Sequence, residues 1–266
     1  MIMLKLIDIH KTFNPGTINE KVALNGVDLH LNEGDFVTVI GGNGAGKSTM
    51  LNAVAGAWPV DSGKIIIGGT DVTKLSEYKR AAYLGRVFQD PMTGTAATMG
   101  IEENLALAKR RGKTRLLRPG ITKAERAEYK ELLKILNLGL EDRLTSKVGL
   151  LSGGQRQALT LLMATLQKPK LLLLDEHTAA LDPKTAAKVL DITDKIVNRD
   201  HLTTLMITHN MKDAIAHGNR LIMMMNGKIV LDIQGEEKKK LTVKQLLDKF
   251  EEASGEEFSN DSAILG

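Results

Sequence analysis

A glycine-rich segment followed by a lysine and a serine is the strongest chemical signal in the sequence. Residues 41–48 read Gly-Gly-Asn-Gly-Ala-Gly-Lys-Ser, a spacing typical of loops that bind phosphate groups. Glycine accepts positive φ angles, so the backbone can curve around an anion and direct successive N–H groups at it. Lys47 would face the β- and γ-phosphates, and the Ser48 hydroxyl would bind Mg²⁺. The residues expected to contact a nucleotide here are Gly41, Asn43, Gly44, Ala45, Gly46, Lys47, Ser48 and Thr49.

Two carboxylates that follow a run of leucines supply the second part of a hydrolytic site. Residues 171–174 are all leucine, and Asp175 and Glu176 come directly after them. Such a run predicts a strand buried on both faces, and ligands bind outside the carboxyl ends of strands in open α/β sheets. Asp175 is suited to holding Mg²⁺, and Glu176 to polarising an attacking water. An isolated acidic pair is often only a solvated strand end, but together with the phosphate loop it indicates nucleotide hydrolysis.

Strand and helix patterns alternate along most of the chain, which predicts an α/β fold that could position these groups. Residues 27–32 alternate apolar with polar side chains, as in a half-exposed antiparallel edge strand, whereas residues 36–40 form a continuous apolar run. A helix is expected over residues 184–197, after Pro183. Asn226-Gly227 predicts a hairpin turn. Further strands are expected at residues 65–67, 203–207, 221–225 and 229–231.

The middle of the chain departs from this alternation. Residues 101–166 have a mostly helical pattern. Thr122 and Glu125 have the spacing of a capping box, which predicts a helix that begins there and continues through Leu136. We therefore expect a helical subdomain, over about residues 95–166, inserted into the α/β core.

The C-terminal segment differs in composition from the rest. We expect the main domain to occupy residues 1–234 and a separate segment to follow at residues 235–266. Within that segment, residues 236–240 predict a charged connector and residues 243–252 a short helix. The remaining tail is polar and is expected to fray.

The composition excludes several classes of protein. The chain has 266 residues, 42% hydrophobic and 26% charged, which is a globular composition with enough apolar residues for a substantial core. The absence of cysteine excludes disulfides, thiolate catalysis and cysteine-bound zinc, and it suits a reducing cytosol. No apolar run approaches the roughly 18 residues of a membrane span, and residues 1–10 lack a signal-peptide pattern. A net charge of only +4 gives little support for nucleic-acid binding.

A third motif lies between the phosphate loop and the acidic pair. Residues 151–155 read Leu-Ser-Gly-Gly-Gln, and a serine before two glycines is on its own a common helix N-terminus. In this order, however, the motifs resemble those of the ATP-binding subunits of ABC transporters, over about residues 3–232. The resemblance implies an α/β P-loop NTPase core with a mostly parallel central sheet, an antiparallel β subdomain and the inserted helical subdomain. Residues 1–234 would then be an ABC-type ATPase domain.

The resemblance also implies roles for side chains outside the phosphate loop. Gln89, within Val-Phe-Gln-Asp, would bind Mg²⁺ and sense a membrane partner, and Asp182, within Ala-Leu-Asp, would reach across a dimer. His209 would contact the γ-phosphate, although a histidine at a strand end is usually structural. Phe13, in a polar and turn-rich setting, would stack on adenine. The implied catalytic residues are Lys47, Gln89, Glu176 and His209; the implied metal ligands are Ser48, Gln89 and Asp175; and the further nucleotide contacts are Phe13, Ser152, Gly153, Gly154, Gln155 and Asp182.

Two positions depart from the family pattern. His177 stands where a proline usually follows the catalytic glutamate, and it is expected to add a titratable group beside the γ-phosphate. Ala179 stands where many members have serine, which removes a hydroxyl near Asp182. The variant segment is similar to that of ATPases of importers for aromatic amino acids.

The partners implied by the resemblance follow from the incomplete site of one chain. Each ATP, with Mg²⁺, would lie between the phosphate loop of one chain and the Ser-Gly-Gly turn of another, so a head-to-tail dimer is expected, most simply a homodimer. Integral membrane permease subunits and an extracytoplasmic substrate-binding protein are the other implied partners. The subunit would lie in the cytoplasm, on the inner face of the membrane. No nucleic-acid partner is expected.

Other interpretations remain open at this point. A soluble ABC-type ATPase of a non-transport complex, for example in cofactor assembly, would share these motifs. DNA-handling members separate their motifs by coiled coils, and no heptad run lies between Lys47 and Asp175. A scaffold without turnover is disfavoured because the implied catalytic residues are all present. Residues 223–225, all methionine, are interpreted as sheet core, and the basic residues within 109–115 and Arg118 as a solvated face.

Overall fold

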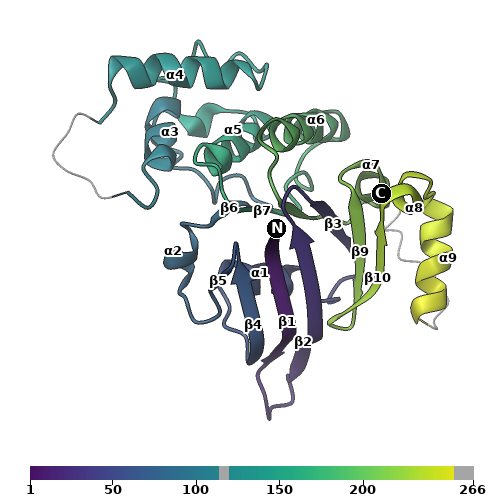
Figure 1. Ribbon diagram of the computed structural model, residues 1–266. Helices are drawn as coiled ribbons and strands as arrows, with labels where there is room; N and C mark the ends of the chain where they lie inside the picture. Colours follow the sequence, from purple (N-terminus) through teal and green to yellow (C-terminus); the bar gives the residue numbers. More distant parts are fainter. Residues whose placement is uncertain (114–119, 255–266) are drawn as a thin grey trace.

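The computed structural model describes residues 1–113 and 120–254, and a six-stranded sheet lies at its centre (Figure 1). The strand order is β10-β9-β3-β8-β7-β6, and every neighbouring pair is parallel except β9 and β10. The expected mostly parallel α/β sheet is confirmed. The loops that follow β3, β8, β7 and β6 therefore leave the same edge of the sheet. The strands are β3 (Phe36–Ile40), β6 (Leu84–Val87), β7 (Leu171–Asp175), β8 (Thr204–Ile207), β9 (Arg220–Met225) and β10 (Lys228–Gln234).

The leucine run of β7 explains how this sheet is held between two layers. Leu171 and Leu173 pack into a core shared with α1 (Lys47–Ala55). Leu172 and Leu174 point the other way, into a core shared with α5 (Gly153–Thr165). Because successive side chains of a strand face opposite sides, a strand covered on both faces needs apolar residues at every position. The interpretation of residues 171–174 as a doubly covered strand is confirmed.

A second, antiparallel sheet covers α1 from the other side. Its order is β2-β1-β4-β5, with β2 at one edge. The alternating residues 27–32 lie in β2 with their apolar side chains buried, so the predicted edge strand is confirmed. The elements are β1 (Ile2–Phe13), β2 (Lys21–Asn32), β4 (Ser62–Ile67) and β5 (Thr70–Asp71), and the short helix α2 (Glu77–Arg80) follows.

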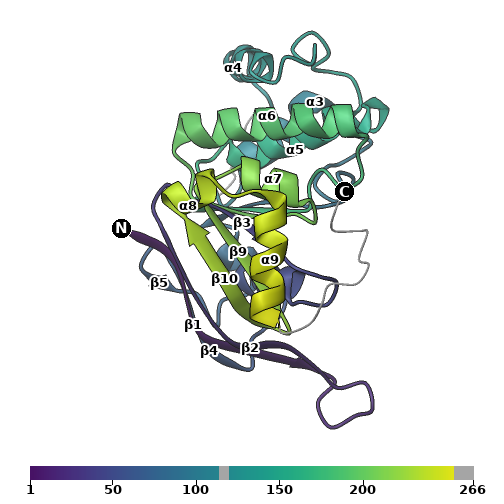
Figure 2. The same ribbon diagram turned by 90° about the vertical axis from the view of Figure 1, so that its right-hand side faces the viewer.

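Helices cover the opposite face of the parallel sheet (Figures 1 and 2). The Thr122–Glu125 capping box is present and opens α4, which ends at Lys134 rather than at Leu136. The predicted helix after Pro183 is also present and is longer than expected, because it continues to Asp200. The helices of this layer are α3 (Ile101–Lys109), α4 (Lys123–Lys134), α5 and α6 (Pro183–Asp200), and a single 3₁₀ turn spans Val148–Leu150.

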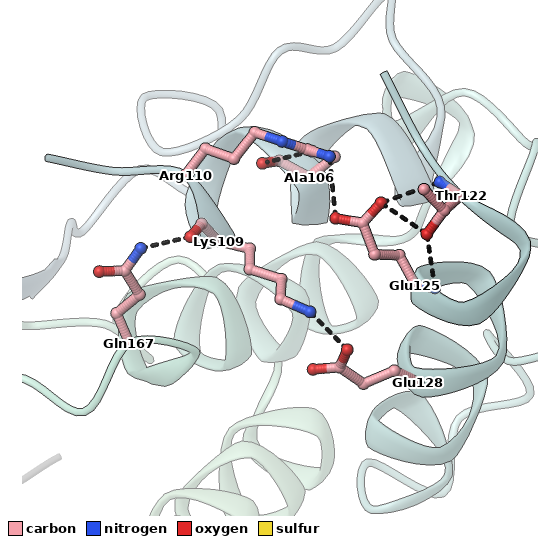
Figure 3. A network of polar contacts seen from close by, with 7 residues as sticks. All are labelled: Ala106, Lys109, Arg110, Thr122, Glu125, Glu128 and Gln167. Atoms are coloured by element: carbon pink, nitrogen blue, oxygen red, sulfur yellow. Dashed lines mark hydrogen bonds and ion pairs between the residues drawn. The ribbon is translucent and has the colours of Figure 1, made fainter. Parts of the chain in front are cut away.

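Ion pairs join α3 to α4, and they involve the basic residues interpreted above as a solvated face (Figure 3). Lys109 pairs with Glu128. Arg110 donates to Glu125 at 2.8 Å, and Glu125 also accepts from the Thr122 N–H at 2.8 Å. These two cations therefore serve contacts within the chain. Of the other basic residues in that stretch, Arg111 is half-buried and Lys113 is exposed, whereas Arg115 and Arg118 lie outside the described residues.

The C-terminal segment packs against β9 and β10 (Figure 2). Its elements are α8 (Gly235–Lys239) and α9 (Val243–Ser254), and both pack against α7 (Met211–Ala216), which precedes β9. The expected connector at residues 236–240 is instead largely the helix α8. Lys238 of this helix is buried, and its ammonium donates to the carbonyl of Gly218 at 2.9 Å. The predicted hairpin turn is present, with φ of 48° at Asn226 and 74° at Gly227. The predicted frayed tail lies outside the described residues.

Candidate active site

The phosphate loop has the backbone shape that its glycines predict. It connects the carboxyl end of β3 to the start of α1, and Gly41, Gly44 and Gly46 have φ of 149°, 80° and 103°. A Cβ atom at Gly46 would lie only 2.5 Å from the carbonyl oxygen of Ala23. This position therefore excludes any larger residue on two grounds, backbone angle and space.

The Lys47 ammonium group lies inside this loop. Its Nζ donates to the carbonyl oxygens of Gly41 at 2.7 Å and Gly42 at 3.2 Å. Burial lowers the pKa of Lys47, and the nearby Glu176 and Asp175 carboxylates oppose that shift. A bound polyphosphate would add negative charge at the same place and favour the charged form of the lysine.

An open cavity of about 270 Å³ lies over the loop and brings several of the predicted residues together. The loop, the expected adenine-stacking residue Phe13 and the expected base Glu176 share its wall. Sequence motifs did not identify Lys21 and Ala23, which lie on β2 opposite the end of β1. The lining residues are Phe13, Lys21, Ala23, Asn43, Gly44, Ala45, Gly46, Lys47, Ser48, Thr49 and Glu176.

An aromatic pair holds Phe13 in place. The Phe13 and Trp58 rings meet edge to face, with centroids 5.1 Å apart and an interplanar angle of 83°. The Lys11 ammonium lies 5.5 Å from the Phe13 centroid and is itself paired with Asp61 at 3.0 Å. Trp58 was not identified from the sequence, because its role depends on a contact with a residue far away along the chain. The pair gives the cavity a rigid apolar end.

The acidic pair lies at the carboxyl end of β7, as the leucine run predicted. Glu176 has φ of 44°, a left-handed conformation that is strained for a residue with a side chain. Its N–H donates to the Ile207 carbonyl at 3.1 Å, which ties the turn to β8. His209 Nδ1 lies 3.7 Å from Glu176 Oε2. The loops after β7 and β8 thus bring the His209 imidazole close to the Glu176 carboxylate, which itself lines the cavity.

The expectation for His177 is wrong. Its side chain is 2% exposed and lies against α6, where Nε2 is 3.0 Å from the Thr193 hydroxyl. Burial, reinforced by the charge of His217, lowers the pKa of His177 to about 4, so it is neutral near pH 7. The turn at Glu176 directs the next side chain into the core beneath α6, and therefore His177 adds no titratable group beside the phosphates.

The Ser-Gly-Gly turn lies outside this cavity. Ser152 Oγ accepts from the Gln155 N–H at 3.3 Å, and Gln155 Oε1 accepts from the Ser152 N–H at 3.2 Å, a capping box at the start of α5. A Cβ atom at Gly154 would collide with Thr185 of α6, so this glycine permits close packing of two helices in one chain. The serine hydroxyl accepts one hydrogen bond and keeps its own proton to donate elsewhere.

Other predicted residues also lie away from the lining of the cavity. Asp182 caps α6, where its carboxylate accepts from the Thr185 N–H at 3.1 Å. Gln89 follows β6 and Asp175 ends β7, at the same edge of the sheet as the loop. One chain therefore combines residues 43–49 of the phosphate loop with Phe13 and Glu176. The predicted residues that do not line its cavity are Gly41, Gln89, Asp175, Asp182, His209 and residues 152–155.

Comparison with known proteins decides the family. A family model described as ABC transporter matches residues 24–179, more than half of the chain. The chain belongs to the ABC transporter family. It is the ATP-binding, ATP-hydrolysing subunit of such a transporter, as the motifs predicted, and the P-loop NTPase fold class is confirmed. None of the helices in the described parts of the chain could span a bilayer.

Curated relatives of this ABC subunit include transport ATPases for small solutes. It is 46% identical to the tyrosine transport ATP-binding protein of Clostridioides difficile, over 94% of this chain and the whole of that protein. It is 36% identical to the methionine import ATP-binding protein MetN of Rhizobium etli, over 86% of this chain but only 60% of that protein. The second match thus covers less than two thirds of the MetN length.

Solved ABC cassettes share the fold and include nucleotide-bound forms. The ADP conformation of the cassette MJ1267 has a TM-score of 0.77 and 27% identity, over 97% of this chain and 100% of that one. The dimeric cassette MJ0796 with ADP and phosphate has a TM-score of 0.74 and 30% identity, over 87% and 98% respectively. The family therefore binds adenine nucleotides and forms dimers.

Proposed function

We propose that this subunit powers the import of an amino acid through a separate membrane permease. The similarity to a tyrosine transport ATPase extends over nearly the whole chain, and a methionine import ATPase matches most of it. An amino acid is the substrate class that these relatives have in common. The transported molecule itself would contact the permease and an extracytoplasmic substrate-binding protein. This chain would therefore power transport without binding or selecting the substrate.

ATP would bind with its adenine against Phe13 and its phosphates in the loop. The observation that carries the hydrolytic part of the proposal is that Glu176 lines the same cavity as residues 43–49. Glu176 would orient and polarise the attacking water, with His209 beside its carboxylate. Lys47 and the N-terminus of α1 would offset the charge of the transferred phosphoryl group.

Mg²⁺ fits the donor set near the loop. Ser48, Asp175 and Gln89 offer oxygen ligands, which suit a hard cation. The described residues contain no cluster of three or more His, Cys, Asp or Glu that could hold a metal ion by itself, and Mg²⁺ is commonly bound by one or two carboxylates together with substrate phosphates. When bound, the ion would neutralise charge on the phosphates.

Two chains would complete each site. Ser152, Gly153 and Gly154 do not line the cavity of their own chain, and the Ser152 hydroxyl proton is free to donate. We propose that these residues, with Gln155 and Asp182, face the ATP of a partner copy in a head-to-tail homodimer. ATP binding would close the dimer, hydrolysis would open it, and Gln89 would pass the motion to the permease at the cytoplasmic face of the membrane.

The Glu176→Gln variant tests this proposal. It should retain ATP binding but hydrolyse ATP at least about 10²-fold more slowly, the scale for loss of one general base. Glu33→Gln, at an exposed turn outside the cavity, is the matched control and should keep normal turnover. Near-normal turnover of the Glu176 variant would remove that residue from catalysis.

The same variant, held closed by ATP, can serve as bait in detergent-solubilised membranes. Recovery of a polytopic permease supports transport, whereas recovery of soluble partners alone would favour the non-transport ATPase. The substrate class is then tested with the wild-type subunit reconstituted with its permease. Binding protein loaded with tyrosine or methionine should raise the ATPase rate of this complex.

A further inference from the structure

Asn52 and Arg86 link two of the residues expected to hold Mg²⁺, Ser48 through its backbone carbonyl and Asp175 through its carboxylate. Asn52, one turn after Ser48 in α1, donates from Nδ2 to the Ser48 carbonyl at 2.8 Å. Arg86, on β6 beside β7, donates from Nη2 to Asn52 Oδ1 at 2.8 Å and approaches Asp175 Oδ2 at 3.4 Å. No motif of the family assigns a role to either Asn52 or Arg86 in this sequence.

The Arg86–Asp175 pair lies where solvent screens it weakly. The two side chains are only 14% and 16% exposed. Burial raises the pKa of Asp175, and Arg86 is the largest influence that opposes the shift, ahead of Lys47. Arg86 and Asp175 therefore form an ion pair that solvent screens only weakly. Glu77 contributes little to holding the Arg86 guanidinium, because its carboxylate is exposed and lies 3.9 Å from that group.

Arg86 also contacts the segment that leads to Gln89. Its guanidinium carbon lies 4.5 Å from the centre of the Phe88 ring, and Phe88 directly precedes Gln89. The Nε atom of Arg86 is buried and has no hydrogen-bond partner among the described residues. The planar group is thus held by Phe88 on its face and by Asn52 and Asp175 at its edge, a geometry that the compact ammonium of lysine cannot reproduce.

We infer that Arg86 is a positioning residue which, with Asn52, sets the placement of Ser48 relative to Asp175 and couples both to the Phe88–Gln89 segment. The inference rests on the proposed Mg²⁺-ATP site. Partners behind a metal ligand fix its orientation, and their loss typically lowers metal affinity by about 10–100-fold. Arg86 would act through Asp175 and would not contact the metal itself.

The test measures how ATP binding depends on Mg²⁺. Trp58 is the only tryptophan of the chain and contacts Phe13, so its fluorescence reports nucleotide in the cavity. In Arg86→Met, the Mg²⁺ concentration that gives half of the Mg²⁺-dependent change should rise about 10–100-fold. ATP affinity in EDTA should stay unchanged. Arg86→Lys should recover only part of the loss, and Asn52→Leu should shift in the same direction.

Glu77→Gln is the matched control. It removes the other carboxylate near Arg86 and should leave the Mg²⁺ dependence as in the wild type. Thermal unfolding of each variant, without ligand, separates a stability loss from a change in metal affinity. If Arg86→Met does not fold, Asn52→Leu and Arg86→Lys carry the test.

Two results would overturn the inference. One is an unchanged Mg²⁺ dependence in a folded variant, which would make the network purely structural. The other is tighter Mg²⁺ binding, which would show that Arg86 competes with the metal for Asp175. A wild-type protein whose fluorescence responds to neither ATP nor Mg²⁺ would instead contradict the proposed function.

Discussion

Lys21 is a cation of the cavity that no sequence motif assigns. Its Nζ lies 3.0 Å from where a Cβ atom of Gly44 would be, directly over the phosphate loop. Within the described residues, Lys21 has no hydrogen bond or ion pair with another side chain. It pairs in register with Phe13 across β1 and β2, and both residues line the cavity, so both would face the nucleotide that we propose binds there.

We predict that Lys21→Gln weakens ATP binding about fivefold, which corresponds to about 1 kcal/mol for an exposed charge pair. The loss should be smaller for ADP and absent for adenosine, because the lysine would attract phosphate charge. Trp58 fluorescence titrations measure all three affinities. Lys5→Gln, an exposed lysine of β1 outside the cavity, should change none of them. An equal loss for adenosine would contradict the charge argument.

What could be predicted at single residues depended on how local the cause is. The phosphate loop and the acidic pair follow from short patterns with their own backbone requirements. Trp58 and Arg86 act through partners distant in the sequence, and no spacing marks them. His177 was placed wrongly because the direction of its side chain depends on the left-handed turn at Glu176, which the family pattern of a following proline does not reveal.

At the scale of elements, α7 connects the imidazole of the site to the C-terminal segment. Its N-terminus is capped by Asn210, directly after His209. At its other end His217 Nδ1 lies 2.8 Å from Asp194 of α6, and Lys238 of α8 donates to the carbonyls of His217 and Gly218. The run of charges at residues 236–240 suggested a solvated connector, because charge patterning alone does not reveal that one lysine turns inward.

His217 should make this connection depend on pH. Its hydrogen bond to Asp194 is the main cause of a raised pKa. Asp213 adds to the shift, while burial and, to a smaller extent, Lys238 oppose it. A raised pKa in the folded state means that the charged histidine stabilises the fold fully below its unfolded pKa, about 6.5. That contribution is lost as pH rises through the folded pKa. The stability advantage of wild type over His217→Gln should therefore be largest in acid and smaller in alkali.

Urea unfolding at several pH values measures this advantage. His30→Gln, an exposed histidine of β2, is the control and should show no such pH-dependent difference. An advantage for wild type that grows with pH would reverse the assigned sign. His177 lies near His217, and burial keeps it neutral across the range above its pKa of about 4, so it should not obscure the comparison.

At the scale of the whole molecule, the alternating periodicity predicted the α/β class, and the Thr122–Glu125 capping box and Pro183 predicted where two helices begin. The order of the strands could not be predicted from periodicity, because hydrophobic period and strand propensity do not determine which strands pair. The surface of a second chain that would face the nucleotide in the cavity could not be predicted from residue patterns within one chain. In the monomer, residues 152–155 form an ordinary capped helix start. Their proposed partner is a phosphate of the ATP that is bound to another copy of the chain.

Ser152 offers a test of that arrangement which leaves the helix start intact. Aspartate is as good an N-cap as serine, so Ser152→Asp should keep α5 folded while placing a negative charge against the γ-phosphate of the partner copy. In a Glu176→Gln background with Mg²⁺-ATP, light scattering should detect a dimer that the added Ser152→Asp abolishes. Ser152→Asn, also a good cap but neutral, should retain much of it. Because Ser152 does not line its own cavity, ATP binding by the monomer should be equal in all three. Dimerisation that survives the aspartate would mean that this turn does not face the nucleotide.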